Sequence, residues 1–400
     1  MAGHHDLATP PRYRGRIVAH RSSELPRRRP LRTLALVVLL VLGGAFVWSL
    51  NYRTQYYAIT PGLAQPVGPL IKVSGHPHAG TRRTILLTDV YLTQLTAFQW
   101  LLAELHPVHE ELLNGSQFNG PSVPTSELEA QGYLEMYESQ ESAKVAAMRA
   151  LHLHVAGTGA GVSVYSLTQR VLAGDPLRVA DRIVAVGGRR VTGFCGLLHA
   201  LGHVTFGRPI SMRVEHADTS SGLLVYGPPT TVSVPSTEVK GVPRTLPCTA
   251  VEGVSAVEVP QLGAVLWPSM SWRFPFAVSI NTADIGGPSA GLAMALGVLD
   301  ALSKVSITGD LHVAATGTIS PGGGVGDVGG VAEKTIAVEN AGATVFLVPE
   351  EEYLVARRAA SGGLKVIAVR NLSQAIAAIV RLGGADPVPI TDPARSTSRP

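Results

Sequence analysis

The 400-residue sequence has few charged residues and almost no cysteine. Charged residues make up 16% of it and hydrophobic residues 46%, which excludes an intrinsically disordered chain and supplies enough apolar side chains for packed cores. Cys195 and Cys248 are the only cysteines, so a disulfide framework is excluded, although one crosslink between them is left open. No catalytic motif surrounds either cysteine. Four hundred residues suggest two or three domains.

Metal-ligand patterns and nucleotide-binding loops are also missing. Two His-x-His pairs, at residues 76–78 and 152–154, each place two imidazoles on one strand face, but no acid or cysteine follows at ligand spacing. The glycines at 75 and 80 have the spacing of a P-loop, yet Thr81-Arg82 replaces the required Lys-Ser/Thr. We therefore expect no metal and no cofactor, and no hydrolysis of ATP.

Positive charge is confined to one end of the chain. The first 33 residues carry eight arginines against two acids, so the remainder is slightly acidic although the total net charge is +4. A slightly acidic folded part argues against nucleic acid as a partner. Residues 1–33 are predicted to form a basic, flexible, cytoplasmic arm.

An uncharged apolar run from Leu34 to Leu50 follows the arginines. It is long enough to cross a bilayer, and Trp48 and Tyr52 lie where an interfacial aromatic belt is expected, so residues 34–52 are predicted to be a transmembrane anchor. A cleaved signal peptide is the alternative, but no small-x-small cleavage pattern follows the run. Because arginines precede the span, the N-terminus is expected in the cytoplasm and the rest of the chain outside it.

The most informative stretch runs from residue 281 to 342. Gly-Gly-Pro followed by Ser289 and an apolar run predicts a turn that leads into a buried helix, with Ser289 in its first turn and unpaired backbone N–H groups nearby. A second helix is predicted from Gly329 to Gly342, with Lys334 in an apolar row where burial would lower its pKa. The alternatives are a helix-capping serine and a lysine that extends its amine to solvent.

Gly-Pro-Ser289-Ala-Gly and Gly-Gly-Val-Ala-Glu-Lys334 resemble the two motifs of the proteolytic domain of the Lon family of serine proteases, over roughly residues 250–383. The resemblance implies that Ser289 is the nucleophile, that Lys334 is the general base, and that the hydroxyl of Thr316 helps to hold this dyad. Gly286 stands where the commonest family pattern has an aspartate. The sequence around Ser289 resembles that of a membrane-anchored, PDZ-containing branch of the family. The resemblance to Lon-type domains also implies a possible homo-oligomer.

The same serine also fits the G-x-S-x-G elbow of α/β-hydrolases. That fold needs a histidine well after the serine, and the only one is His312, just 23 residues on, which leaves no room for the sheet between them. The esterase alternative is therefore weak. A dyad with a lysine base requires no histidine.

A β-rich segment precedes the motif stretch. Residues 152–218 combine a glycine loop, apolar strands and a short helix, and resemble a PDZ domain. In such domains the strand after the glycine loop accepts a peptide strand, which would make Gly161, Val162 and Ser163 peptide-binding residues. The alternative is a packing module that binds nothing.

Together these patterns predict an α/β (α+β) Lon-type proteolytic domain, preceded by a β-rich PDZ-like domain and one N-terminal transmembrane helix. The expected function is that of an ATP-independent, membrane-anchored serine endopeptidase that hydrolyses protein or peptide substrates outside the cytoplasm. A non-catalytic PDZ scaffold is the alternative. The expected divisions after the anchor are an extracytoplasmic region at 56–150, the PDZ-like domain at 152–218, a linker at 219–249, the protease domain at 250–383 and a disordered tail at 384–400.

Overall fold

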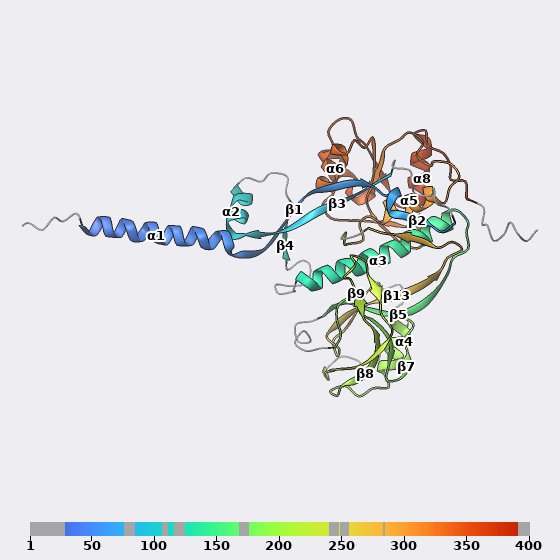
Figure 1. Cartoon of the computed structure of the whole chain (residues 1–400), viewed down its shortest axis with the longest axis horizontal. Coiled ribbons are helices and arrows are strands. Elements are labelled where there is room, and N and C mark those ends of the chain that lie inside the picture. The colour runs from blue at the N-terminus through green and yellow to red at the C-terminus, as the bar shows by residue number, and fades with distance from the viewer. Residues whose placement is uncertain are drawn as a thin grey trace, which may run out of the picture.

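The structure is a computed structural model that describes residues 29–75, 85–105, 111–115, 125–167, 176–239, 248, 256–282 and 285–390. The helices and strands form a long N-terminal helix, a layered α/β part and a β-rich module (Figure 1). Most of the predicted basic arm, the histidine pair at 76–78 and the end of the predicted tail lie outside the described residues.

Helix α1 (Arg29–Asn51) extends away from the rest of the molecule (Figure 1). Its stretch Arg32–Asn51 has a mean hydropathy of 2.4, and none of the other described residues buries it. At about 1.5 Å per residue, its 23 residues are long enough to cross the roughly 30 Å hydrocarbon core of a bilayer. The apolar run thus forms one helix that could span a membrane, or could act as a signal sequence.

The main sheet has six strands in the order β19-β18-β15-β3-β1-β4. Strands β3, β15, β18 and β19 are parallel, whereas β1 runs antiparallel to both β3 and β4. These strands are β1 (Arg53–Pro66), β3 (Ile85–Thr96), β4 (Glu111–Asn114), β15 (Val313–Ala315), β18 (Val345–Pro349) and β19 (Lys365–Val369).

Helices cover both faces of this sheet. Residues of α3 (Thr125–Ala150), α5 (Gly291–Ala301) and α8 (Leu372–Arg381) share one apolar core with one face of the strands. Residues of α6 (Val331–Asn340) and α7 (Tyr353–Ala359) form a smaller core with the opposite face. Strand residues alternate between the two cores, as the period of two requires. Every residue of α5 is buried, which explains its continuously apolar sequence.

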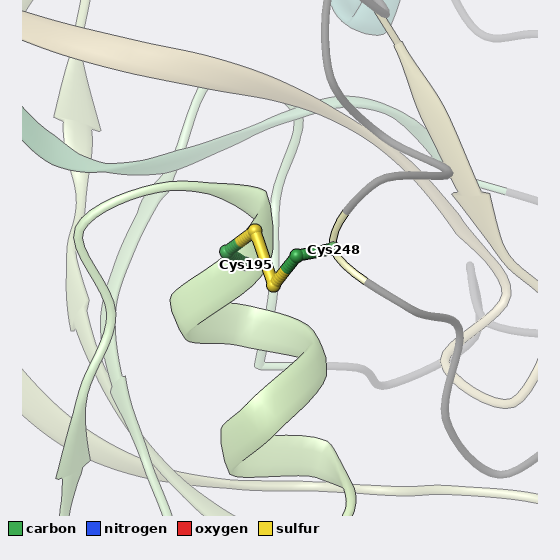
Figure 2. The surroundings of a disulfide bond; sticks show 2 residues. All are labelled: Cys195 and Cys248. Atoms are coloured by element: carbon green, nitrogen blue, oxygen red, sulfur yellow. A yellow bond between two sulfur atoms is a disulfide. The ribbon is translucent and has the colours of Figure 1, made fainter.

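The β-rich module has its own sheet, in the order β11-β8-β6-β5-β13-β12, and its own apolar core. Helix α4 (Phe194–Leu201) packs on it, and a disulfide joins Cys195 of this helix to Cys248 (Figure 2). The strands are β5 (Ala156–Leu167), β6 (Arg182–Val186), β7 (Arg189–Arg190), β8 (Ile210–Glu215), β11 (Thr230–Val234), β12 (Val257–Val259) and β13 (Ala264–Arg273).

The structure differs from the expected division of the chain. The region 56–150 is not a unit of its own, because β1 and β3 complete the main sheet and α3 packs on α5. The segment expected to be a linker contains β11, which pairs with β8 in the module. Strand β13 lies in the region expected to be protease domain but pairs with β5 of the module. Strands β3 and β13 have partners that are distant in sequence, which local composition cannot indicate, whereas β11 pairs with a strand only 16 to 24 positions earlier.

The remaining elements are short. Helix α2 (Ala97–Leu105) follows β3 and lies beside the end of α1 (Figure 1). Strand β2 (Ile71–Val73) pairs with β14 (Val278–Ile280). The others are the pairs β9 (Ala217–Asp218) with β10 (Val225–Tyr226) and β16 (Thr318–Ile319) with β17 (Val325–Gly326), and the 3-10 turns Gly68–Leu70 and Glu350–Glu352.

Candidate active site

Ser289 lies in the turn immediately before α5, two residues ahead of the first helical residue. Gly287 makes this turn possible through its left-handed φ of +87°. The N-cap position belongs to Ala290, and no side chain caps the helix, so Ser289 is not the capping residue. Its hydroxyl makes no hydrogen bond to any residue that the structure describes, and its side chain is half-buried. The hydroxyl is therefore available for chemistry.

The backbone of Ser289 is fixed to the end of β15. The Thr316 hydroxyl donates to the Ser289 carbonyl oxygen at 3.2 Å, and the Gly317 N–H donates to the same oxygen at 2.9 Å. In return, the Leu292 N–H donates to the Gly317 carbonyl at 3.0 Å. Thr316 thus holds the predicted nucleophile through its backbone, whereas the sequence suggested a more general role in holding the dyad.

Lys334 lies in the first turn of α6 with only 2% of its surface exposed. The helix begins after Gly330, which has a left-handed φ of +66°, and closes at Gly342 as the sequence predicts, with the Ala343 N–H bonded to the Val338 carbonyl at 3.0 Å. A lysine that extends its amine into solvent is excluded by this burial. Ala341, seven positions after Lys334 and thus on the same side of the helix, is exposed because the helix has ended at Asn340.

Burial dominates the electrostatics of Lys334. Desolvation lowers its pKa from 10.5 to about 8, and the negative charges of Glu352, Asp89 and Glu333 oppose this effect. Burial also raises the pKa of Glu352 to about 7, although one of its oxygens accepts a hydrogen bond from the Val328 N–H. With a pKa near 8, the amine is neutral in roughly one molecule in five at physiological pH, far more often than at the ordinary pKa of a lysine, so it can accept a proton.

The groups around both candidate residues meet at one end of the main sheet. Thr316 directly follows β15, and Glu352 follows β18 by three residues. Strand β3 continues past β15, so that Asp89 lies two residues beyond Leu87, the partner of Ala315. In α/β proteins, ligand-binding and active sites usually lie at the carboxyl ends of the parallel strands. Among the described residues, no hydrogen bond joins the Ser289 hydroxyl to the Lys334 amine.

Two backbone N–H groups beside the serine are available for an anion. Within the described part of the chain, no acceptor is bonded to the N–H groups of Ser289 and Ala290, which precede the buried helix α5. Donors at a helix start favour developing negative charge. This position suits an oxyanion formed when Ser289 attacks a carbonyl.

Helix α3 supports the same turn, which the sequence did not indicate. The Gly132 carbonyl accepts from the Gly287 N–H at 2.9 Å, and the buried Ser139 hydroxyl donates to the Pro288 carbonyl at 3.0 Å. No local signal in the sequence connects Ser139 with a turn 149 positions along the chain. Asp89 and Glu352 were missed for the same reason.

Gly161, Val162 and Ser163, predicted to bind a peptide, lie in the middle of the module's sheet. They pair with β13 on one side, and Val162 and Ser163 pair with β6 on the other. The free strand edge that the prediction requires is therefore occupied. Peptide binding at these residues stays a prediction that requires β13 to leave.

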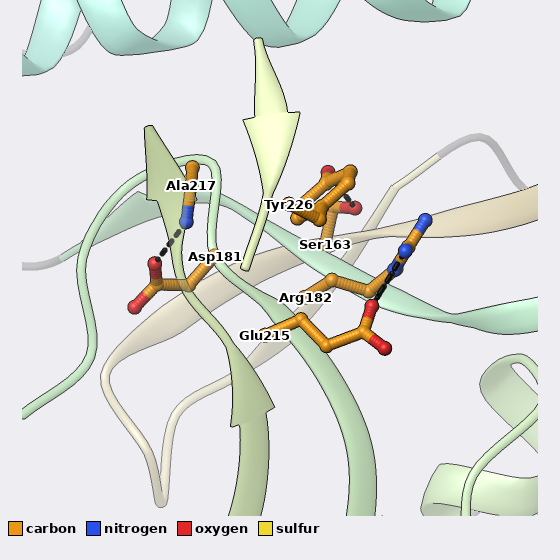
Figure 3. A network of polar contacts seen from close by, with 6 residues as sticks. All are labelled: Ser163, Asp181, Arg182, Glu215, Ala217 and Tyr226. Carbon is orange, nitrogen blue, oxygen red and sulfur yellow. Dashed lines mark hydrogen bonds and ion pairs between the residues drawn. The ribbon is translucent and has the colours of Figure 1, made fainter. Parts of the chain in front are cut away.

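The surroundings of Ser163 form a polar network rather than an open groove. Its hydroxyl lies 3.3 Å from the Tyr226 hydroxyl, and Arg182, which stacks on the Tyr226 ring, forms an ion pair with Glu215 (Figure 3). No group of three or more His, Cys, Asp or Glu residues that could hold a metal occurs in the described parts of the chain.

Comparison with known proteins agrees with the geometry. Residues 282–380 match the C-terminal proteolytic domain of Lon protease (S16). The chain contains a Lon proteolytic domain. The matched range includes Ser289, Thr316 and Lys334, and it supports a serine protease.

The chain is also similar to curated Lon proteases. It is 49% identical to Lon protease of Clostridioides difficile over 65 residues, which cover 16% of this chain and 8% of the relative. It is 38% identical to Lon protease 2 of Bacillus subtilis over 104 residues, which cover 26% of this chain and 17% of the relative. The similarity therefore spans less than a fifth of the length of either relative.

Proposed function

We propose that this protein is a membrane-anchored serine endopeptidase in which Ser289 is the nucleophile and Lys334 the general base. The observation that carries the proposal is the buried Lys334, with its lowered pKa, at the end of the sheet where Thr316 and Gly317 hold Ser289. A purely structural role does not explain an amine in this position, because burying a chargeable group costs free energy that an apolar side chain of similar size would not.

The reaction follows from these positions. The neutral Lys334 amine takes the proton of the Ser289 hydroxyl while the serine oxygen bonds to the peptide carbonyl carbon. The N–H groups of Ser289 and Ala290 stabilise the negative carbonyl oxygen. Lys334 then gives its proton to the leaving amine as the peptide bond breaks. Water, deprotonated by the same amine, hydrolyses the remaining ester and restores Ser289.

Three features support action at a membrane and outside the cytoplasm. Helix α1 could span a bilayer, and arginines precede its apolar stretch. The disulfide between Cys195 and Cys248 suits an oxidising compartment. The absence of a Walker-type loop from the sequence supports hydrolysis without ATP.

The test uses the full chain in detergent micelles. A fluorescently labelled unfolded protein is the substrate, and activity is measured with and without ATP for the parent, Ser289→Ala and Lys334→Met. We expect cleavage by the parent in both conditions and at least a thousandfold loss in each variant. A fluorophosphonate probe should label the parent and leave Ser289→Ala unlabelled. Labelling of that variant, or retained cleavage by Lys334→Met, would contradict the corresponding role. A well-folded parent with neither cleavage nor labelling would favour the non-catalytic scaffold.

A further inference from the structure

Helix α2 is an apolar helix that lies against the end of α1 and contributes to none of the apolar cores of the described residues (Figure 1). It begins with a reciprocal cap, in which the Thr96 N–H donates to the Gln99 side chain at 2.9 Å and the Gln99 N–H donates to the Thr96 hydroxyl at 3.3 Å. Trp100 stacks on Tyr56 of β1, with ring centroids 5.5 Å apart. These contacts fix both the position and the rotation of α2.

Apart from Trp100, the large apolar side chains of α2 form one stripe. Phe98, Leu101, Leu102 and Leu105 have the spacing i, i+3, i+4, i+7 and share one helix face. Phe98 packs edge-on against Phe46 of α1, with ring centroids 5.3 Å apart. The three leucines are 49%, 43% and 64% exposed. The leucines of the stripe that touches α1 are therefore exposed, since none of the described residues covers them.

The contact with α1 also sets the depth of this stripe. Phe46 lies five residues before the end of α1 at Asn51, which is about 7 Å along a helix axis. If α1 spans the bilayer up to the level of Trp48 and Tyr52, a helix that touches Phe46 lies at the boundary between headgroups and acyl chains. Amphipathic helices lying in a membrane surface bury their apolar face to about 5–10 Å.

We propose that α2 lies in the membrane surface as a second anchor, with Leu101, Leu102 and Leu105 inserted into the lipid. The proposal rests on the membrane anchoring of α1 that forms part of the proposed function. Its occupant is lipid rather than a second copy of the chain. Three leucines on a nine-residue helix offer far less area than a stable protein interface of about 1,600 Å² requires, and the lipid that surrounds α1 is already adjacent.

The second anchor has a consequence for the protease domain. Strand β1 continues from α1, and β3 leads into α2, and the same two strands lie in the main sheet beside β15. Two attachments at the base of one antiparallel pair restrict rotation of that pair about the α1 axis. The main sheet, and with it Ser289, would be held in one orientation relative to the bilayer.

The experiment uses the full chain reconstituted in phosphatidylcholine vesicles that contain lipid brominated at carbons 6 and 7 of one acyl chain. A tryptophan is introduced in Leu102→Trp and, as the matched control on the opposite, polar face, in Glu104→Trp, and the fluorescence of the parent is subtracted. We expect the tryptophan at position 102 to be quenched at least threefold more than the one at position 104. Equal quenching would overturn the proposal. A blue-shifted, unquenched signal that depends on protein density would also overturn it, because a second copy would then cover the stripe.

Carbonate extraction of the same vesicles tests anchoring by α1 separately from insertion of α2. Protein released by carbonate would show that α1 does not anchor the chain, which contradicts the anchoring in the proposed function. Protein that stays in the vesicles without selective quenching at position 102 would contradict only the role of α2. Thermal unfolding curves that match the parent would show that both reporter variants fold.

Discussion

Replacing Lys334 with methionine should abolish proteolysis and, at the same time, stabilise the fold. Methionine fills a similar volume but has no charge to desolvate. The pKa of Lys334 falls from 10.5 in an unfolded chain to about 8 in the folded protein. At about 1.4 kcal/mol per pKa unit, keeping this amine charged in the folded state costs about 3.5 kcal/mol, and this figure already contains its attraction to Glu352. We therefore expect Lys334→Met to add about 3 kcal/mol at pH 7.

The stability gained by Lys334→Met should depend on pH, in a direction set by the lowering of the Lys334 pKa. Below pH 8 the amine is charged in both the folded and the unfolded states, and the folded state bears the full desolvation penalty. Between pH 8 and 10.5 the folded protein binds fewer protons than the unfolded chain, so the stability of the parent rises with pH and the advantage of Lys334→Met shrinks.

Urea unfolding of the full chain in detergent, followed by tryptophan fluorescence at pH 7 and pH 10, measures this difference. Ser289→Ala serves as the control, because it removes activity without removing a buried charge. Lower stability of Lys334→Met at pH 7, or a gain that does not diminish at pH 10, would refute the assignment of Lys334 as a desolvated base.

Three further predictions concern groups around the site and in the module. Glu352→Gln keeps an acceptor for the Val328 N–H but removes a negative charge that raises the pKa of Lys334, so the pH at half-maximal cleavage should fall below about 8. A rise in that pH would contradict the role of Lys334 as the base. Ser139→Ala removes the hydrogen bond that holds the turn before Ser289, and kcat should fall by about fivefold with little change in KM, consistent with about 1 kcal/mol for one hydrogen bond; a change in KM alone would show a different role. Cys195→Ser opens a crosslink across 53 residues and should lower the free energy of unfolding of the module by about 4 kcal/mol, and the parent in reductant should then match the variant.

The local part of the candidate site could be read from the sequence. A glycine-rich turn, a serine and an apolar run identify the start of α5, and Gly330 and Gly342 delimit α6, because helix signals lie within a few residues of the helix they define. The burial of Lys334 followed from the period of the same helix. These features depend on neighbouring residues only.

The remainder depends on contacts between distant segments. Strand β3 enters the main sheet beside β15, which lies more than two hundred residues later, and so brings Asp89 towards Lys334. The pairing of β13 with β5 occupies the edge at which a peptide was expected to add. Hydrophobic alternation predicts that a strand exists but does not name its partner, and neither contact could be foreseen.

Helix α3 lies between the module and the main sheet (Figure 1). One of its residues, Glu138, is a buried acid, so its effect on stability should depend on pH in the opposite direction to that of the buried base Lys334. The Oε1 atom of Glu138 is buried and has no hydrogen-bond partner among the described residues, and burial raises the pKa of its carboxyl from 4.5 to about 7. Between these values the folded protein binds more protons than the unfolded chain, so this group lowers stability as the pH rises. Glu138→Gln should therefore add about 2 kcal/mol at pH 8 and only about a quarter of that at pH 5. Lys334→Met should show its full gain at pH 5 and lose it at pH 10. If both variants changed with pH in the same direction, desolvation could not be the cause of both shifts, and the argument for a neutral Lys334 would lose its physical basis.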